Sequence, residues 1–173
     1  DGAEPRLVSQ ALASLTRIAH SLGGDYVLMR SASERGLAIA REIGDDDGIA
    51  WFLQRLGTAH VNQHDLAGGI ALLEESVARY RVLDDDRGIA SALNNLGCAH
   101  LADGRPEPAE PAFAEALERF ERLGEPEEVA IPLHNLGLCA LFVGRHGDAL
   151  ARFREGVHMA DRRSYVEAVA YGL

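Results

Sequence analysis

Residues 86–104 read DRGIASALNNLGCAHLADG, and this stretch recurs 40 residues away on both sides. Its counterparts are residues 46–64 (DDGIAWFLQRLGTAHVNQH) and residues 126–144 (PEEVAIPLHNLGLCALFVG). The three stretches share a Leu-Gly dipeptide, found at Leu56-Gly57, Leu96-Gly97 and Leu136-Gly137. A fixed period of this length is typical of proteins built by stacking similar units along one axis. The repeat therefore decides the fold.

Each unit contains two apolar series at helical spacing, separated by a turn. In the third unit, Ile89, Leu93 and Leu96 follow the 3–4 spacing of one helix face, and a second series begins at Phe113 beyond a turn at Gly104. We therefore predict an all-α, right-handed α-solenoid of antiparallel helix pairs that forms a single repeat domain over residues 1–173. The expected units are approximately residues 7–44, 45–85, 86–125 and 126–163, followed by the start of a fifth helix pair at 164–173.

A glycine inside the first helix of each unit needs a structural reason, because glycine costs about 1 kcal/mol against alanine there. We expect the second helix to cross closely at this glycine, with small residues on its side of the crossing. The small residues expected there are Ser76, Ala116 and Gly156. Because the chain starts without Met and stops within an amphipathic helix, we expect it to be part of a longer protein.

Composition indicates a folded domain of ordinary globular type, with 47% hydrophobic and 25% charged residues. No apolar run approaches the roughly 20 residues of a membrane span. The net charge is −10 and every basic residue is Arg, which argues against direct nucleic acid contact by this segment. Cys98 and Cys139 lack metal-type clustering, so a reducing compartment and a cytoplasmic location are expected.

The histidines indicate packing rather than chemistry. His60 and His64 have a spacing of four residues, yet no adjacent Glu or third ligand accompanies them, so no metal site is predicted. His64 is expected to take a turn position filled by glycine in other units. His20, His60 and His100 form one repeat column and are expected to pack between helices with a local hydrogen-bond partner. No nucleophile and base are predicted to converge, so we expect neither enzymatic activity nor a cofactor.

The pattern Leu-x-x-Leu-Gly, small residues, then Ala-x-x-x-Phe resembles the tetratricopeptide repeat, here in a 40-residue variety. The match departs from that family where His60 and His100 replace a usual Tyr and where Leu replaces a usual Trp. Residues 83–97 (LDDDRGIASALNNLG) look most like the C-terminal repeat arrays of large bacterial ATP-dependent transcription regulators. The resemblance implies a protein-interaction scaffold; the chain itself has no Gly-x-x-x-x-Gly-Lys-Ser/Thr motif for an ATPase.

The resemblance also implies that the first helix of each unit lines a concave groove. The predicted partner-binding residues are Trp51, Gln54, Arg55, Asn62, Asn94, Asn95, His134, Asn135 and Phe142. Asn95 and Asn135 precede the repeated Leu, where related arrays use amides to clasp a peptide backbone. The alternative is that these amides bridge neighbouring helices. A Lys–Asn pair that clamps a C-terminal carboxylate in chaperone-binding relatives is absent.

Two functions follow as hypotheses. The first is a non-catalytic scaffold, the repeat domain of a bacterial regulatory protein, that binds a protein or peptide of neutral or basic character in its groove. The second is a small-effector sensor that relays ligand binding to a fused ATPase or DNA-binding region. Self-association through the ends of the array is a further expectation, because the apolar face of a terminal unit lacks a neighbour.

Overall fold

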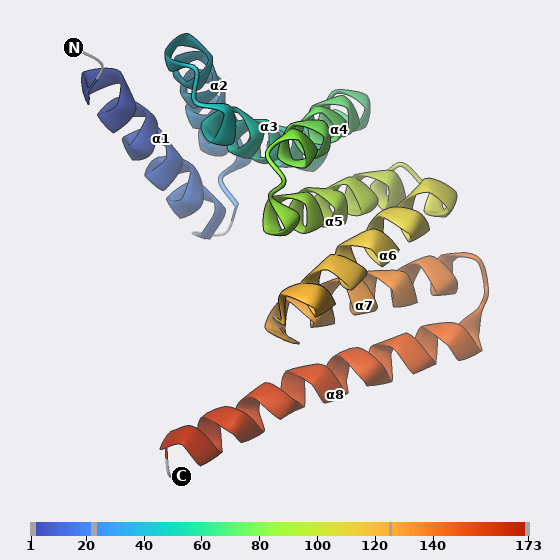
Figure 1. Cartoon of the computed structure of the whole chain (residues 1–173). Coiled ribbons are helices and arrows are strands. Elements are labelled where there is room, and N and C mark those ends of the chain that lie inside the picture. The colour runs from blue at the N-terminus through green and yellow to red at the C-terminus, as the bar shows by residue number, and fades with distance from the viewer. Residues whose placement is uncertain (1–2, 22–23, 125, 172–173) are drawn as a thin grey trace.

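The computed structural model describes the backbone of residues 3–21, 24–124 and 126–171, and the side chains of residues 4–21, 24–124 and 128–159. Within these ranges all regular structure is helical, which confirms the predicted all-α class. The helices are α1 (Ala3–Ser21), α2 (Tyr26–Ile43), α3 (Asp46–Asn62), α4 (Leu66–Val82), α5 (Asp86–Ala102), α6 (Pro106–Leu123), α7 (Pro126–Phe142) and α8 (His146–Tyr171). They follow one another as a stack of antiparallel pairs (Figure 1).

Aspartates set the starts of the helices. The side chain of Asp45 accepts a hydrogen bond from the Gly48 backbone N–H (3.0 Å), and Asp85 accepts the equivalent bond from Gly88 (3.0 Å). Asp65 does the same at the start of α4. An aspartate at this position satisfies a backbone donor that the helix leaves unpaired. One aspartate of each acidic run therefore caps a helix.

The turn within the second unit confirms the expectation for His64. Its φ angle is +66°, in the left-handed region that Gly104 adopts at the same repeat position with +71°. Asp84 likewise has a φ angle of +55° where Gly124 has +70°. The repeat therefore keeps the backbone conformation at these positions even where the sequence does not supply the glycine that favours it.

The glycine column packs against large side chains of the second helix. A β-carbon on Gly57 would lie 2.8 Å from Leu73 Cγ, and one on Gly97 would lie 2.6 Å from the Phe113 ring. The close crossing is confirmed, but the expectation that Ser76, Ala116 and Gly156 form its other side is wrong. Ser76 donates a hydrogen bond to the Ala50 carbonyl (2.8 Å), two turns nearer the start of α3. In an antiparallel pair, residues farther from the connecting turn meet each other, so the small column faces Ala50 rather than Gly57.

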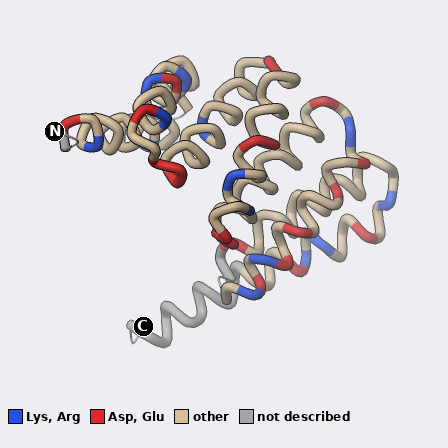
Figure 2. Tube along the Cα trace, turned by 45° about the horizontal axis from the view of Figure 1, so that its top comes forward, with Lys and Arg blue, Asp and Glu red and all other residues tan. Residues whose placement is uncertain are grey.

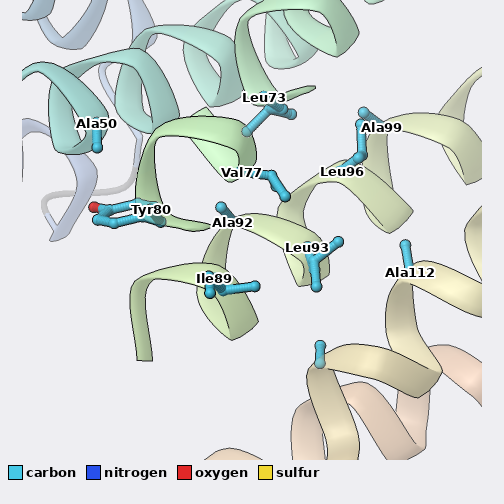
Figure 3. Close-up of a cluster of buried hydrophobic side chains, with 11 residues drawn as sticks. Ala50, Leu73, Val77, Tyr80, Ile89, Ala92, Leu93, Leu96, Ala99 and Ala112 are labelled. Carbon is cyan, nitrogen blue, oxygen red and sulfur yellow. The ribbon is translucent and has the colours of Figure 1, made fainter. Parts of the chain in front are cut away.

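The core runs continuously from one unit to the next. One cluster joins Ala50 of α3 and Leu73 of α4 to Leu93 of α5 and Ala112 of α6 (Figure 3). Phe52 and Phe113 are among the largest side chains that are fully buried. No unit therefore holds an independent core, and the stability of each unit depends on its neighbours.

The last helix differs from the expected unit boundary. The repeat register predicted a break near residue 163 and a new helix from residue 164, whereas α8 runs without interruption from His146 to Tyr171. Residues 161–164 (DRRS) contain neither the glycine nor the aspartate run that stops helices at the other boundaries. The helix therefore continues where the repeat alone indicated a turn.

The odd-numbered helices form the inner layer of the array. The backbone of α3 approaches α1 and α5, and that of α5 also approaches α7. The described even-numbered helices lie too far apart for such backbone approach and meet through long side chains, such as Arg81 of α4 and Glu115 of α6 (2.8 Å). This difference curves the stack and places α1, α3, α5 and α7 on its concave side.

Charges are spread over the surface of this array. Figure 2 shows acidic and basic residues interspersed along the described helices, without a continuous basic stripe. Ion pairs recur at the repeat spacing, as in Arg41–Glu75 and Arg81–Glu115. Such exposed pairs contribute at most about 1 kcal/mol each. In the part of the chain that the structure describes, no helix combines the length and the apolar character needed to cross a bilayer.

Candidate functional site

A ladder of polar side chains crosses the concave face. Gln54 Nε2 of α3 donates to Ser91 Oγ of α5 (2.8 Å), and Asn95 Nδ2 of α5 donates back to Thr58 Oγ1 of α3 (3.3 Å). One unit farther on, Asn135 Nδ2 of α7 donates to Asn94 Oδ1 of α5 (2.9 Å). Each of these hydrogen bonds joins the first helices of two successive units.

These contacts separate the predicted amides into two kinds. Gln54 and Asn135 are buried, with only 1% and 8% of their surfaces exposed, and they link helices. Asn94 and Asn95 are half-buried. Among the described residues, the Asn94 amide nitrogen and the Asn95 amide oxygen have no hydrogen-bond partner. The helix-bridging role that the sequence left open is thus present, while one donor and one acceptor remain available on adjacent residues.

The N-terminal part of the groove centres on Trp51, whose ring lies close to two guanidinium groups. Arg17 Cζ of α1 lies 5.7 Å from the indole centroid, and Arg55 Cζ lies 5.3 Å from it. Both distances fall within the range of cation–π attraction. Arg17 was not among the predicted site residues. In the first unit it occupies the position that is glycine in the other units, and this difference was a signal. An arginine at that column cannot pack as glycine does.

Arg55 is a partly buried cation in unfavourable surroundings. Its Nε is buried without a hydrogen-bond partner among the described residues. Burial lowers the pKa of Arg55, and the charge of Arg17 lowers it further, whereas nearby Tyr80 acts in the opposite direction. Burial also raises the pKa of Tyr80 to about 12, with a smaller contribution from Asp85, so this hydroxyl stays protonated at neutral pH.

The C-terminal part of the groove is apolar and open. Phe142 is 58% exposed and Ile131 is 50% exposed, although both belong to the inner helix α7. His134 is exposed, and its ring lies 5.2 Å from that of Phe153 of α8. Asn62 lies apart from the other predicted residues, at the end of α3, where Nδ2 donates to the Thr58 carbonyl (2.8 Å). The predicted residues therefore form an aromatic and cationic end, an amide centre and an apolar end.

The three histidines of the repeat column differ in burial and in hydrogen-bond partners. His60 Nδ1 lies 2.7 Å from Asp65 Oδ2, which confirms the expected local partner, and this hydrogen bond is the main cause of the lowered Asp65 pKa. His100 is buried, but its Nδ1 has no partner among the described residues, so the same expectation is wrong there. His20 is exposed. The described side chains include no group of three or more His, Cys, Asp or Glu residues placed to hold a metal ion.

His100 makes the stability of the fold depend on pH. Burial lowers the pKa of His100 below its usual 6.5, so the unfolded chain binds the proton more readily than the folded chain. The free energy of unfolding should therefore be highest above pH 6.5 and fall as the pH drops below that value. Urea denaturation at pH 7.5, 6.5 and 5.5 measures this, and His100→Leu should flatten the dependence. His20→Leu, in the exposed member of the column, is the matched control; an unchanged slope in His100→Leu would contradict this origin.

The comparisons with known proteins agree with this architecture. A family model described as tetratricopeptide repeat matches residues 48–122. This segment consists of tetratricopeptide repeats. Proteins with such repeats generally mediate protein–protein interaction. No match was found among curated proteins.

Solved structures share the fold at low sequence identity. BtubC (BKLC) from P. vanneervenii has a TM-score of 0.80 at 20% identity over 92% of this chain and 66% of that protein. A kinesin light chain with nearly identical repeats from Podosopora anserina has a TM-score of 0.68 at 15% identity over 89% of this chain and 76% of its own.

A third similar structure is a larger protein. It is a signal transduction ATPase with numerous domains and a tetratricopeptide repeat sensor, from Pyrococcus horikoshii. The TM-score is 0.65 at 17% identity, over 98% of this chain but only 26% of the ATPase. At such identities the likeness shows the fold of the repeats. The chain spans about two thirds of the P. vanneervenii protein and about a quarter of the Pyrococcus horikoshii protein.

Proposed function

We propose that this chain is a non-catalytic scaffold that binds a peptide or protein segment in the concave groove formed by α3, α5 and α7. The proposal rests on one observation: the polar side chains of the inner layer have different hydrogen-bonding roles. Gln54 and Asn135 are buried and link helices, whereas half-buried Asn94 and Asn95 keep one unpaired donor and one unpaired acceptor among the described residues. A peptide group needs one partner of each type, so this amide pair suits an extended backbone.

The two ends of the groove provide side-chain anchors of different character. Trp51 and Arg55 belong to the residue types that most often dominate binding energy at interfaces. Phe142 and Ile131 expose apolar surface at the other end, which makes burial against a partner favourable. The proposed partner is therefore a segment with an apolar anchor at one end and a polar backbone stretch along α5. With a net charge of −10, a neutral or basic partner is favoured by long-range attraction.

We further propose that the array serves within a bacterial regulatory protein in the cytoplasm. Support comes from the resemblance of residues 83–97 to repeat arrays of transcription regulators. The fold likeness to the repeat sensor of the Pyrococcus horikoshii ATPase fits this role. The length of the full gene product and the domains encoded beside the repeats test this part of the proposal. A product without a regulatory or nucleotide-binding domain would contradict it.

Removing the apolar anchor should weaken partner binding strongly. The partner for this test is a peptide selected from a display library by its binding to the wild-type protein. Calorimetry measures the affinity of this peptide. Phe142→Ser is expected to weaken binding about thirtyfold, because truncating a dominant anchor costs about 2 kcal/mol or more. Val82→Ser is the matched control, since Val82 is 86% exposed but lies on α4, outside the groove. Equal affinities of the two variants would contradict the proposal.

A further inference from the structure

An open surface cavity of about 340 Å³ lies beside Trp51, apart from the amide centre of the groove. Its wall combines α1, the first turns of α3 and the junction of α4 with α5. The lining residues are Ser9, Gln10, Ala13, Arg17, Asp45, Asp47, Gly48, Trp51, Phe52, Tyr80 and Asp85. This volume is at the lower end of the range for small-molecule sites, which runs from about 300 to 1,000 Å³.

The cavity holds opposite charges that do not neutralise one another. Arg17 lines the cavity and shares the Trp51 ring with Arg55, and neither guanidinium has a carboxylate within 4.0 Å among the described residues. Asp47 also lines it and makes no ion pair with any residue described. Asp45 and Asp85 are engaged as helix caps. Elsewhere, arginines such as Arg81 and Arg145 lie within 2.8 Å of a carboxylate oxygen.

A partly buried, unpaired guanidinium is costly in a folded protein, because it loses hydration without gaining a partner. The indole of Trp51 compensates part of the Arg55 charge but leaves its buried Nε without an acceptor. An anionic group on a ligand would supply the carboxylate that neither guanidinium has among the described residues. Asp47 would repel a purely anionic ligand in the cavity. The two arginines would repel a purely cationic ligand.

Polar and aromatic groups complete the wall between these charges. The Tyr80 ring belongs to the core cluster, while its oxygen points away from Val77 and Leu93 (Figure 3). This hydroxyl has no hydrogen-bond partner among the residues described, so it can donate to a ligand in the cavity. Trp51 offers a flat apolar surface.

We propose that this cavity binds a small zwitterion of about dipeptide size, with its carboxylate beside Arg17 and Arg55, its ammonium group beside Asp47 and its apolar part on Trp51. This site shares Trp51 and Arg55 with one end of the groove, but it goes beyond the groove function, because it does not use the amide centre or the apolar end. It makes the array a sensor of a small amphoteric ligand as well as a scaffold.

The chain contains a single tryptophan, Trp51, so its fluorescence reports on this cavity and on the adjoining end of the groove. We would titrate the protein with alanyl-leucine, which is a zwitterion, and with its N-acetylated and C-amidated forms, following both fluorescence and heat. Free alanyl-leucine should give a saturable signal, and blocking either end should weaken binding at least tenfold. Arg55→Gln and Asp47→Asn should each weaken it at least tenfold, whereas Arg35→Gln, in an exposed arginine of α2, should not.

Absence of a saturable response to alanyl-leucine in the folded protein would overturn the proposal. So would equal affinity for the free and the blocked forms, since charge recognition at both ends would then be missing. Phe142→Ser should leave the dipeptide affinity unchanged. The failure of this site is therefore distinguishable from failure of the groove, which the selected peptide reports.

Discussion

Gly97→Leu should destabilise the protein by about 3 kcal/mol, at the upper end of the usual range for overpacking. Even a β-carbon at this position would lie 2.6 Å from the Phe113 ring, so a leucine must force α5 and α6 apart. That movement would also disturb α7, because Phe113 packs with Leu136 and Cys139 of the next unit. Urea denaturation of the purified variant measures the loss.

Gly147 provides the control for this substitution. It lies in a helix, as Gly97 does, but nothing lies within 4 Å of the position of an added β-carbon. Gly147→Leu, in the first turn of α8, should therefore change stability little. If the two variants unfold at the same urea concentration, the close crossing does not explain the glycine column.

Phe113→Ala should cost about 3–5 kcal/mol, the usual loss for truncating a fully buried aromatic side chain. Phe113 is completely buried; it packs with Ala109 of its own helix and, across the boundary between the third and fourth units, with Leu136 and Cys139. Truncation would remove both its burial and its contact with Gly97. The same urea measurement applies, with exposed Phe142→Ala as the control that should remain within about 0.5 kcal/mol of wild type.

Combining the two substitutions tests whether their effects arise from the contact between positions 97 and 113. In Gly97→Leu/Phe113→Ala, the new leucine would occupy space vacated by the ring, so the total loss should be clearly smaller than the sum of the single losses. Additive losses would mean that the two positions act independently, contrary to the packing seen here.

The architecture was predictable because the 40-residue period places the same side-chain type at the same contact in every unit. Leu93 and Phe113, for example, are buried because they make the same inter-helix contacts as their counterparts in the other units. The continuous helix α8 was not predictable from the period, since a helix ends where local signals stop it. Residues 161–164 lack those signals, although the repeat register predicts a break there.

The groove was predictable only in outline. Placing Asn95 and Asn135 near the concave face follows from the register, but their division into exposed and buried amides depends on the partner across the helix boundary. Asn135 reaches Asn94, whereas Asn95 reaches Thr58, and these partners differ because the groove columns are not repeated. The contact of Arg17 with Trp51 joins residues from two units in columns that do not match, so the period marks Arg17 as an exception but does not predict its partner.

Cys98 offers the most direct test of the claim that the groove carries recognition. It is the exposed cysteine of the inner helix α5, and Asn135 Nδ2 lies 3.6 Å from its sulfur, whereas Cys139 is buried. The rate of maleimide labelling of Cys98 should fall at least tenfold when the selected peptide saturates the protein, and labelled protein should no longer bind the peptide. An unchanged labelling rate at saturation, together with normal binding by labelled protein, would contradict the account and place recognition outside the concave face.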